Sequence, residues 1–324
     1  MRPQVSPFFW LLLLTLAVVS VAVAVSCGGA GCGLKGSWLD PVFQLRWPRV
    51  VSAFAVGGLL ALAGALMQLL LRNPLADPYV LGVSGGAAAG ALSLSLIFPA
   101  AAAVYSMQLG ALLGAVLATV LLFVLTRRTF FSEIGQGSGT SGIRLILTGV
   151  MISAGFGAII TALLTLSTDS QIRNLVFWLM GDLESADFGV SAWLVLLMAA
   201  VWAFSQAKAL NVLSHGELTA HLLGLRVRRL QVSLLLVASV STAAAVAIAG
   251  AIGFIGLVVP HALRLVLGND QRVVLPASVL TGGIVLTLAD LLARSLVAPM
   301  QLPVGVITAL IGVPVFLALL SRAR

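Results

Sequence analysis

The chain has 324 residues, of which 60% are hydrophobic and 9% are charged, and its mean hydropathy is +1.14. Soluble domains carry about 25% charged residues, so this composition excludes a water-soluble globule and indicates an integral membrane protein. The net charge of +8 is explained better by arginines at cytoplasmic helix ends than by nucleic-acid binding.

Ten apolar segments are predicted to be transmembrane helices, because a helix needs about 20 residues to cross a bilayer core of about 30 Å. In chain order they cover residues 8–26, 50–71, 79–98, 104–126, 143–166, 190–207, 230–250, 252–267, 273–297 and 303–321. Their short connections leave no room for a soluble domain. Residues 1–324 are therefore predicted to form a single transmembrane domain of an all-α integral membrane protein.

The basic residues predict the orientation. With the N-terminus inside, 13 of the 18 lysines and arginines lie in cytoplasmic segments, as the positive-inside rule requires. An even number of helices then places both termini in the cytoplasm. The outer basic residues are Lys35, Arg46, Arg49, Arg173 and Arg294.

The first outer loop contains the two cysteines of the chain, Cys27 and Cys32. They could form a disulfide or remain free thiols, and two cysteines alone do not make a metal site. The loop ends in the sequence RWPR, in which Pro48 suits the first turn of a helix. Arg46 and Arg49 are then expected to point out of the membrane.

Glycines occur repeatedly in the second and third predicted helices and in the hairpin that leads into the eighth. The eighth helix also contains Pro260. The glycines are Gly57, Gly58, Gly64, Gly82, Gly85, Gly86, Gly90, Gly250, Gly253 and Gly256. In lipid, glycine permits close contact between helices or local unwinding. We therefore expect tight helix packing here and a breakable eighth helix.

The fifth predicted helix carries small residues four positions apart, which share one face. They are Gly149, Ser153, Gly157, Thr161 and Thr165. This stripe predicts either a mildly polar wall of a translocation path or a seam of small residues between two packed helices. Both interpretations stay open.

The outer stretch after the fifth helix predicts a short helix over 171–180, capped by Asp169 or Ser170 and ended by Gly181. Arg173 within it could meet an anionic substrate near the outer mouth, or pair with Asp169 at the surface.

Ionisable residues are scarce within the predicted helices. Asp290 is the only acidic residue clearly inside one, and Arg294 four positions later can pair with it near the outer surface. A carrier driven by protons or sodium ions would be expected to hold acidic residues deeper in the membrane.

The stretch 210–229, LNVLSHGELTAHLLGLRVRR, is too polar to cross a bilayer. It predicts two short amphipathic helices folded back at Gly224 on the cytoplasmic face, where a soluble partner could bind. A loop held near the lipid headgroups by its arginines is an equally good interpretation. The sequence has no GxxxxGK[ST] phosphate loop and no HExxH motif, so neither ATP use by that route nor an intramembrane enzyme is expected.

Seven stretches together resemble the FecCD-type permeases, which are subunits of bacterial ABC importers for iron chelates, haem and vitamin B12. They are QLRWPRV (44–50), GALMQLLLRNPLADPYVLGVSGGA (64–87), LTGVMISAGFGAI (147–159), FWLMGDL (177–183), HGELTAHLLGL (215–225), GFIGLVVPHALRLVLGNDQR (253–272) and QLPVGVITALIGVPVF (301–316). Each stretch is weak evidence alone. Their order and spacing over nearly the whole chain make the resemblance specific.

The resemblance implies a homodimer with the substrate path at its interface, two separate ATPase subunits and a periplasmic substrate-binding protein. It implies no cofactor bound to this chain, because ATP is used by the partner. The stretch 208–229 corresponds to the family's cytoplasmic coupling helices, with contacts expected at Ser214, His215, Gly216, Glu217, Leu222 and Gly224. Arg46, Arg49 and Arg294 match outer arginines that, in the family, pair with acidic residues of the binding protein; anchoring of helix ends at the headgroups is the alternative.

These observations predict an inner-membrane permease that moves a metal chelate inward, with the fifth helix and 171–180 forming the gate. Haem or a ferric siderophore is favoured over cobalamin, because such chelates are often anionic and Arg173 is available. A secondary carrier driven by an ion gradient and a membrane anchor without transport are the competing interpretations.

Overall fold

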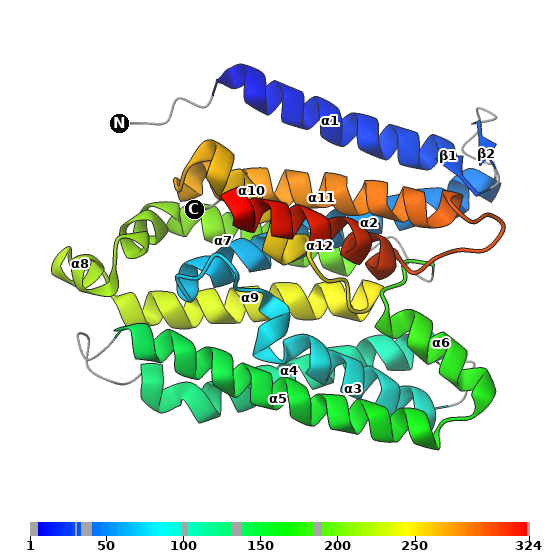
Figure 1. The fold of residues 1–324 in the computed structure, drawn as a ribbon, viewed down its shortest axis with the longest axis horizontal. Helices are drawn as coiled ribbons and strands as arrows, with labels where there is room; N and C mark the ends of the chain where they lie inside the picture. Colours follow the sequence, from blue (N-terminus) through cyan, green and yellow to red (C-terminus); the bar gives the residue numbers. More distant parts are fainter. Residues whose placement is uncertain are drawn as a thin grey trace.

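The computed structural model describes residues 6–29, 31–33, 41–98, 103–130, 138–184 and 190–322. Most of them lie in helices, and Figure 1 shows the long helices side by side along one axis. The elements in chain order are α1 (Pro7–Ser26), β1 (Cys27–Gly28), β2 (Gly31–Cys32), α2 (Pro41–Leu70), η1 (Pro78–Leu81), α3 (Val83–Ile97), α4 (Ala103–Phe130), α5 (Ser138–Leu166), α6 (Asp169–Leu179), α7 (Val190–Ser214), α8 (Glu217–Leu222), α9 (Val227–Ala249), α10 (Ile255–Leu267), α11 (Gln271–Ser295) and α12 (Val304–Arg322).

Each predicted transmembrane segment coincides with a helix in the described part of the chain. Eight of these helices are long and apolar enough to cross a bilayer, whereas α3 and α10 are shorter apolar helices of 15 and 13 residues. The prediction of an all-helical integral membrane protein is confirmed, but two of the predicted segments are not full-length spans.

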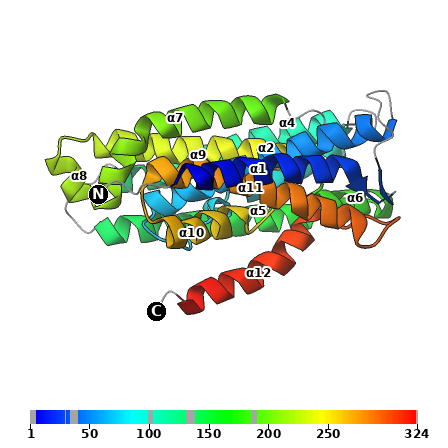
Figure 2. The ribbon, with the colours of Figure 1, turned by 90° about the horizontal axis from the view of Figure 1, so that it is seen from above.

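The two ends of the bundle carry different elements. The short helix α8 lies at one end, together with the start of α1 and the end of α12 (Figure 1). The opposite end holds α6 and the antiparallel β1–β2 pair. We call these the α8 end and the α6 end. Figure 2 shows α12 inclined away from the other helices.

The centre of the bundle is α2. In the most apolar stretch of 18 residues in α2, 89% of the residues are buried within this single chain, whereas the corresponding share in α5 is 17%. Because α2 packs against α1, α7, α9, α10 and α11, it has to be apolar on nearly every side. It begins at Pro41, earlier than predicted, so Pro48 lies inside the helix and not in its first turn.

Glycines bring the central helices into close contact, as the sequence predicts. A Cβ atom on Gly57 would overlap the carbonyl group of Gly282 in α11. One on Gly64 would overlap the carbonyl group of Gly256 at the start of α10. The same reciprocal contact joins α3 to α4 through Gly86, Gly90, Gly110 and Gly114. Such contacts let the helices gain close van der Waals packing in lipid.

The short helices α3 and α10 begin inside the bundle. Gly256, at the start of α10, lies against Leu60 of α2 and against Pro78 of η1. Leu60 is ten residues before the end of α2, a rise of about 15 Å, so α10 starts well within the length of α2. The Tyr79 hydroxyl accepts a hydrogen bond of 2.9 Å from the backbone N–H of Ile252 and joins the two starting points.

This arrangement corrects the predicted full spans over 79–98 and 252–267. In each case an irregular stretch precedes the helix, an arrangement that membrane proteins tolerate where protein covers the irregular backbone. Asp77, whose carboxylate accepts the backbone N–H of Tyr79 at 2.8 Å, precedes η1 in the first of these stretches.

The predicted outer helix is present as α6, and it ends before Gly181, which has a φ of +86°. Its cap differs from the prediction. Thr168 is the N-cap, and its backbone N–H donates to Oε1 of Gln171 at 3.2 Å in a capping box. The predicted caps Asp169 and Ser170 are the first residues of the helix itself.

We expect Gly64→Ala to lower the thermal stability of the chain in detergent, because the added methyl group has to displace the backbone of α10. Overpacking typically costs about 1–3 kcal/mol. The matched control is Gly155→Ala in α5, where an added Cβ atom meets nothing within 4 Å. Equal melting temperatures for the two variants would contradict the packing described for α2.

Candidate functional site

The stretch predicted to bind a cytoplasmic partner forms one short helix between two long ones. α7 continues to Ser214, α8 covers Glu217–Leu222 and α9 begins at Val227. The prediction of two short helices folded back at Gly224 is wrong, because the residues before Gly216 extend α7. Gly216 and Gly224 have φ values of +123° and +80°, which favour glycine and let the chain turn on both sides of α8. We call residues 214–226 the α8 hairpin.

Asn211 joins the end of α7 to the start of α11. Its side-chain amide donates to Oδ1 of Asp270 at 2.7 Å, and its side-chain oxygen accepts the backbone N–H of Gln271 at 2.7 Å. Oδ1 of Asp270 also accepts the backbone N–H of Arg272 at 3.0 Å and caps α11. The α8 hairpin therefore starts from a fixed position.

The first residues of the α8 hairpin bind back to the bundle. Oγ of Ser214 donates to the backbone oxygen of Asn211 at 2.7 Å, and Nδ1 of His215 lies 2.8 Å from the same oxygen. A carbonyl oxygen only accepts, so His215 carries a proton on Nδ1 in this bond. Glu217 pairs with Arg72, just after α2, across 3.4 Å. The hairpin is thus connected to both α2 and α11.

α8 exposes an apolar group beyond the ends of the long helices. Leu218, Leu222 and Leu223 are 59%, 77% and 67% exposed. Apolar groups of this kind at a polar surface are typical of interaction sites. Leu222 and Gly224, two of the predicted contacts, share this exposed edge. Leu218 and Leu223 are missing from the predicted contacts, although their spacing with Leu222 signals the same apolar face.

The three outer arginines are buried. Arg46, Arg49 and Arg294 are 8%, 8% and 6% exposed. Asp290, which is 0% exposed, bridges two of them. Its Oδ1 lies 2.8 Å from Nη2 of Arg49, and its Oδ2 lies 3.0 Å from Nε of Arg294. The predicted pair of Asp290 and Arg294 is confirmed, whereas the predicted outward orientation of Arg46 and Arg49 is wrong, because buried guanidinium groups need acceptors within the protein.

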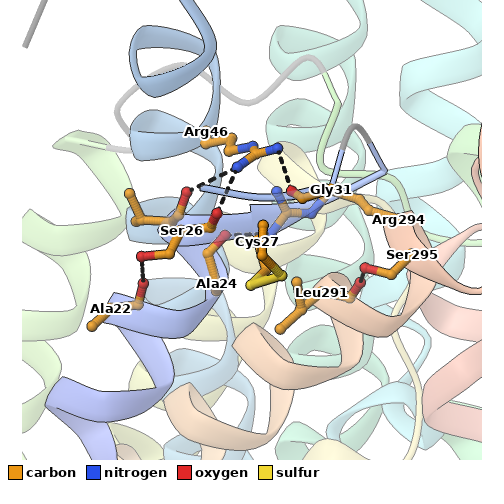
Figure 3. Close-up of a disulfide and its surroundings, with 11 residues drawn as sticks. Ala22, Ala24, Ser26, Cys27, Gly31, Arg46, Leu291, Arg294 and Ser295 are labelled. Atoms are coloured by element: carbon orange, nitrogen blue, oxygen red, sulfur yellow. Dashed lines mark hydrogen bonds between the residues drawn. A yellow bond between two sulfur atoms is a disulfide. The ribbon is translucent and has the colours of Figure 1, made fainter. Parts of the chain in front are cut away.

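Arg46 holds a small disulfide loop against the bundle (Figure 3). Its Nη1 donates to the backbone oxygen of Ser26 at 3.0 Å, and its Nη2 donates to that of Gly31 at 3.3 Å. Cys27 and Cys32 form a disulfide in this loop. Of the two alternatives that the sequence leaves open, the structure thus contains the disulfide.

Two further bonds extend the cluster to other parts of the chain. Nη1 of Arg49 donates to Oε1 of Gln301 at 2.8 Å, and Nη2 of Arg294 donates to the backbone oxygen of Ala24 at 3.2 Å. The bonds join α1, α2, α11 and the segment before α12 at the α6 end. We call Arg46, Arg49, Asp290, Arg294 and Gln301 the arginine cluster.

The small-residue stripe of α5 divides into two parts. Gly149 is buried, and Ser153 is half-buried beside Gly82 at the start of α3, so this part is a packing seam. Thr161 and Thr165 are exposed, and their hydroxyl groups donate to carbonyl oxygens of α5 itself. The seam interpretation therefore fits the buried part, whereas the translocation path along the exposed part stays a prediction.

The part of the stripe toward α6 is open. A Cβ atom on Gly157 would meet no atom within 4 Å, and Arg173 in α6 is exposed. Because 17% of the residues in the most apolar stretch of α5 are buried, α5 has a broad face that no other described residue of this chain covers. In that same part of the chain, no group of three His, Cys, Asp or Glu residues is placed to hold a metal ion.

The sequence and the fold match known proteins along their whole length. A model of the FecCD transport family matches residues 7–322. The hemin transport system permease protein HmuU of Yersinia pestis is 38% identical, over 100% of this chain and 98% of HmuU. The vitamin B12 import system permease protein BtuC of Salmonella paratyphi A is 39% identical, over 97% of this chain and 95% of BtuC. A solved structure described as an inward-facing conformation of an ABC transporter assigned to the metal-chelate type has a TM-score of 0.85 at 29% identity, covering 98% of this chain and 100% of the other.

We expect Asp290→Asn to destabilise the protein strongly, because it leaves two buried guanidinium groups without their shared counter-charge. Breaking a buried ion pair costs about 3–5 kcal/mol, and the midpoint of thermal unfolding in detergent should fall by about 5–10 °C. Glu184→Gln is the control, since it removes an exposed carboxylate. Equal midpoints for the two variants would show that the arginine cluster does not stabilise the fold.

Proposed function

This chain belongs to the FecCD transport family, and from that membership we propose that it is the permease subunit of an ATP-driven importer that carries a metal chelate into the cell. It is a multi-pass protein of the bacterial inner membrane. The observation that carries the proposal is the full-length similarity to hemin and vitamin B12 permeases, at 38% and 39% identity.

In the proposed topology, ten helices lie in the membrane, both termini are cytoplasmic, and the α8 end faces the cytoplasm. Two features support this orientation. The start of α1, the end of α12 and the α8 hairpin lie at the same end (Figure 1). The disulfide lies at the other end, as expected for the side that faces an oxidising compartment.

The α8 hairpin is the proposed contact for a separate ATPase subunit. Its exposed leucines supply an apolar surface, and its bonds to Arg72 and Asn211 connect that surface to α2 and α11. A rigid-body push on the hairpin would therefore reach two central helices. The proposed contacts are Ser214, His215, Gly216, Glu217, Leu222 and Gly224, to which the structure adds Leu218 and Leu223.

We assign the translocation path to the interface between two copies of the chain, along the open part of the α5 stripe. The exposed Thr161 and Thr165, the open space at Gly157 and the exposed Arg173 support this assignment. Gly149 and Ser153, proposed for the path from the sequence, fit a packing role better because of their burial. The gate would consist of α5 and α6.

A periplasmic substrate-binding protein is the proposed partner at the α6 end. Arg46, Arg49 and Arg294 do not present free charges to it, because they are buried. We propose instead that the arginine cluster fixes the shape of the docking surface by holding the disulfide loop and the ends of α2 and α11 together.

The substrate is proposed to be haem or a ferric siderophore, with cobalamin as the alternative. Similarity does not separate them, since the hemin and vitamin B12 permeases are almost equally identical to this chain. The scarcity of acidic residues within the predicted helices argues against an ion-driven carrier. Family membership is the stronger argument against that alternative.

We expect Glu217→Arg to abolish chelate-stimulated ATP hydrolysis in the assembled complex, because it places a like charge beside Arg72 and displaces the α8 hairpin. The dimer should stay intact in size-exclusion chromatography. The charge-swapped variant Arg72→Glu with Glu217→Arg restores the pair. Recovery in that variant would assign Glu217 to holding the hairpin, and continued loss would assign it to contact with the ATPase. Normal stimulation by Glu217→Arg alone would remove it from the coupling site.

The proposed substrate is tested by measuring the rate of ATP hydrolysis in the complex reconstituted with the binding protein. We expect haem or a ferric siderophore to stimulate hydrolysis more than cobalamin does, since Arg173 favours an anionic chelate. Arg173→Gln should weaken that preference. Stimulation by cobalamin alone would establish the alternative, and uptake without any ATPase would contradict ATP-driven import.

A further inference from the structure

A polar cavity of about 370 Å³ lies at the α8 end, where the ends of α2 and α7 meet α10 and the start of α11. Its lining includes Gln68, Arg72, Ser214, His261, Arg264 and Gln271. The cavity opens beside the α8 hairpin but is not part of the apolar surface proposed for the ATPase. The proposed coupling site shares Ser214 and Arg72 with its lining, but the function proposed so far assigns no ligand to the cavity.

The lining of the cavity is cationic. Two arginines carry its charge, and none of the described residues that line it is acidic. The carboxylate of Glu217 neutralises Arg72 only in part, across 3.4 Å and with both side chains partly exposed. Arg264 has no acidic partner among the described residues. The cavity therefore favours an anion.

Four polar atoms in the lining have no hydrogen-bond partner among the described residues. They are Oε1 of Gln68, Oε1 of Gln271, Nε2 of His261 and Nε of Arg264. Gln68, Gln271 and His261 are 1%, 1% and 6% exposed. Buried polar groups without a partner cost about 1–3 kcal/mol each, so a ligand that bonded to these groups would relieve that cost.

The orientation of these side chains is fixed by the bonds that they do make. Nε2 of Gln68 donates to the backbone oxygen of Leu257 at 3.0 Å, and Nε2 of Gln271 donates to that of Asn269 at 2.9 Å. Nη2 of Arg264 donates to the backbone oxygen of Ala65 at 2.8 Å. The two amide oxygens therefore remain as acceptors, while the guanidinium remains as a donor. A suitable ligand has to be an anion that also carries hydroxyl donors.

We propose that this cavity binds the headgroup of an anionic glycerophospholipid. The phosphodiester would accept from Arg264 and Arg72, and the glycerol hydroxyl groups would donate to the amide oxygens of Gln68 and Gln271. The location supports a lipid, because the cavity lies at the end of α2, which in the proposed topology is the cytoplasmic end of a membrane-spanning helix. Basic pockets between transmembrane helices on the cytoplasmic side are known to bind such headgroups.

A bound headgroup would touch the α8 hairpin through two residues. Ser214 lines the cavity and belongs to the hairpin, and Arg72 both lines the cavity and pairs with Glu217. The lipid would therefore reinforce the position of the hairpin relative to α2. This role concerns the permease chain alone and does not depend on the identity of the ATPase or the chelate.

The test is native mass spectrometry of the full-length chain in detergent. The probes are phosphatidylglycerol and phosphatidylcholine with identical acyl chains, with inorganic phosphate as a competitor. We expect retention of phosphatidylglycerol to exceed that of phosphatidylcholine by about tenfold, which corresponds to one charge-assisted hydrogen bond. Millimolar inorganic phosphate should not displace it.

The variants locate the binding. Arg264→Gln should abolish the preference for phosphatidylglycerol, and Gln271→Met should reduce it by removing one acceptor for the hydroxyl groups. Arg272→Gln is the matched control, because Arg272 is an exposed neighbour of Gln271 that does not line the cavity. The preference should survive there unchanged.

Three outcomes would overturn the proposal. The first is equal retention of both lipids by the unmodified chain, a measurement that does not depend on any variant folding. The second is an equal loss of preference in Arg272→Gln and Arg264→Gln, which would indicate general attraction to a basic surface. The third is displacement of the lipid by inorganic phosphate, which would indicate a site for a free anion.

Discussion

The close approach of α2 to α10 and α11 is the constraint on which the rest of the structure depends. In a bilayer, helices gain nothing from hiding apolar side chains from lipid, so association relies on close packing and buried polar bonds. Gly57 and Gly64 supply the close packing because a methyl group at either position would overlap a backbone carbonyl. α2 is thereby covered by protein over its most apolar part.

Both ends of α2 carry polar groups that connect it to other helices. At the α6 end, Arg49 shares Asp290 with α11, and Arg46 binds the disulfide loop. At the α8 end, Gln68 binds the start of α10 and Arg72 binds α8. A helix fixed in this way at both ends moves as one body, so displacement of the α8 hairpin and rearrangement of the arginine cluster are linked through α2.

Local patterns in the sequence predict much of this structure. Hydrophobic length places all the membrane helices, and the spacing of Asp290 and Arg294 predicts their pair, because both depend on neighbours along one helix. The features that the sequence predicts wrongly depend on contacts between residues that are far apart along the chain. Arg46 turns inward because the carbonyl oxygens of Ser26 in α1 and of Gly31 in the disulfide loop accept hydrogen bonds from it. α3 and α10 are shorter than the predicted spans because the irregular stretches before them, η1 and the segment around Ile252, contact each other inside the bundle.

The arginines beside the disulfide loop also determine how the first helix is attached. In the most apolar stretch of α1, 28% of the residues are buried. Among the described long helices, α1 packs mainly along α2 and α11. At its last turn, however, Arg46 and Arg294 both bind its backbone oxygens. A thicker or thinner bilayer would therefore be accommodated by a change in the tilt of α1 about this attached end. A mismatch between bilayer thickness and helix length would thus change the position of α1 alone, and the central helices would keep their spacing.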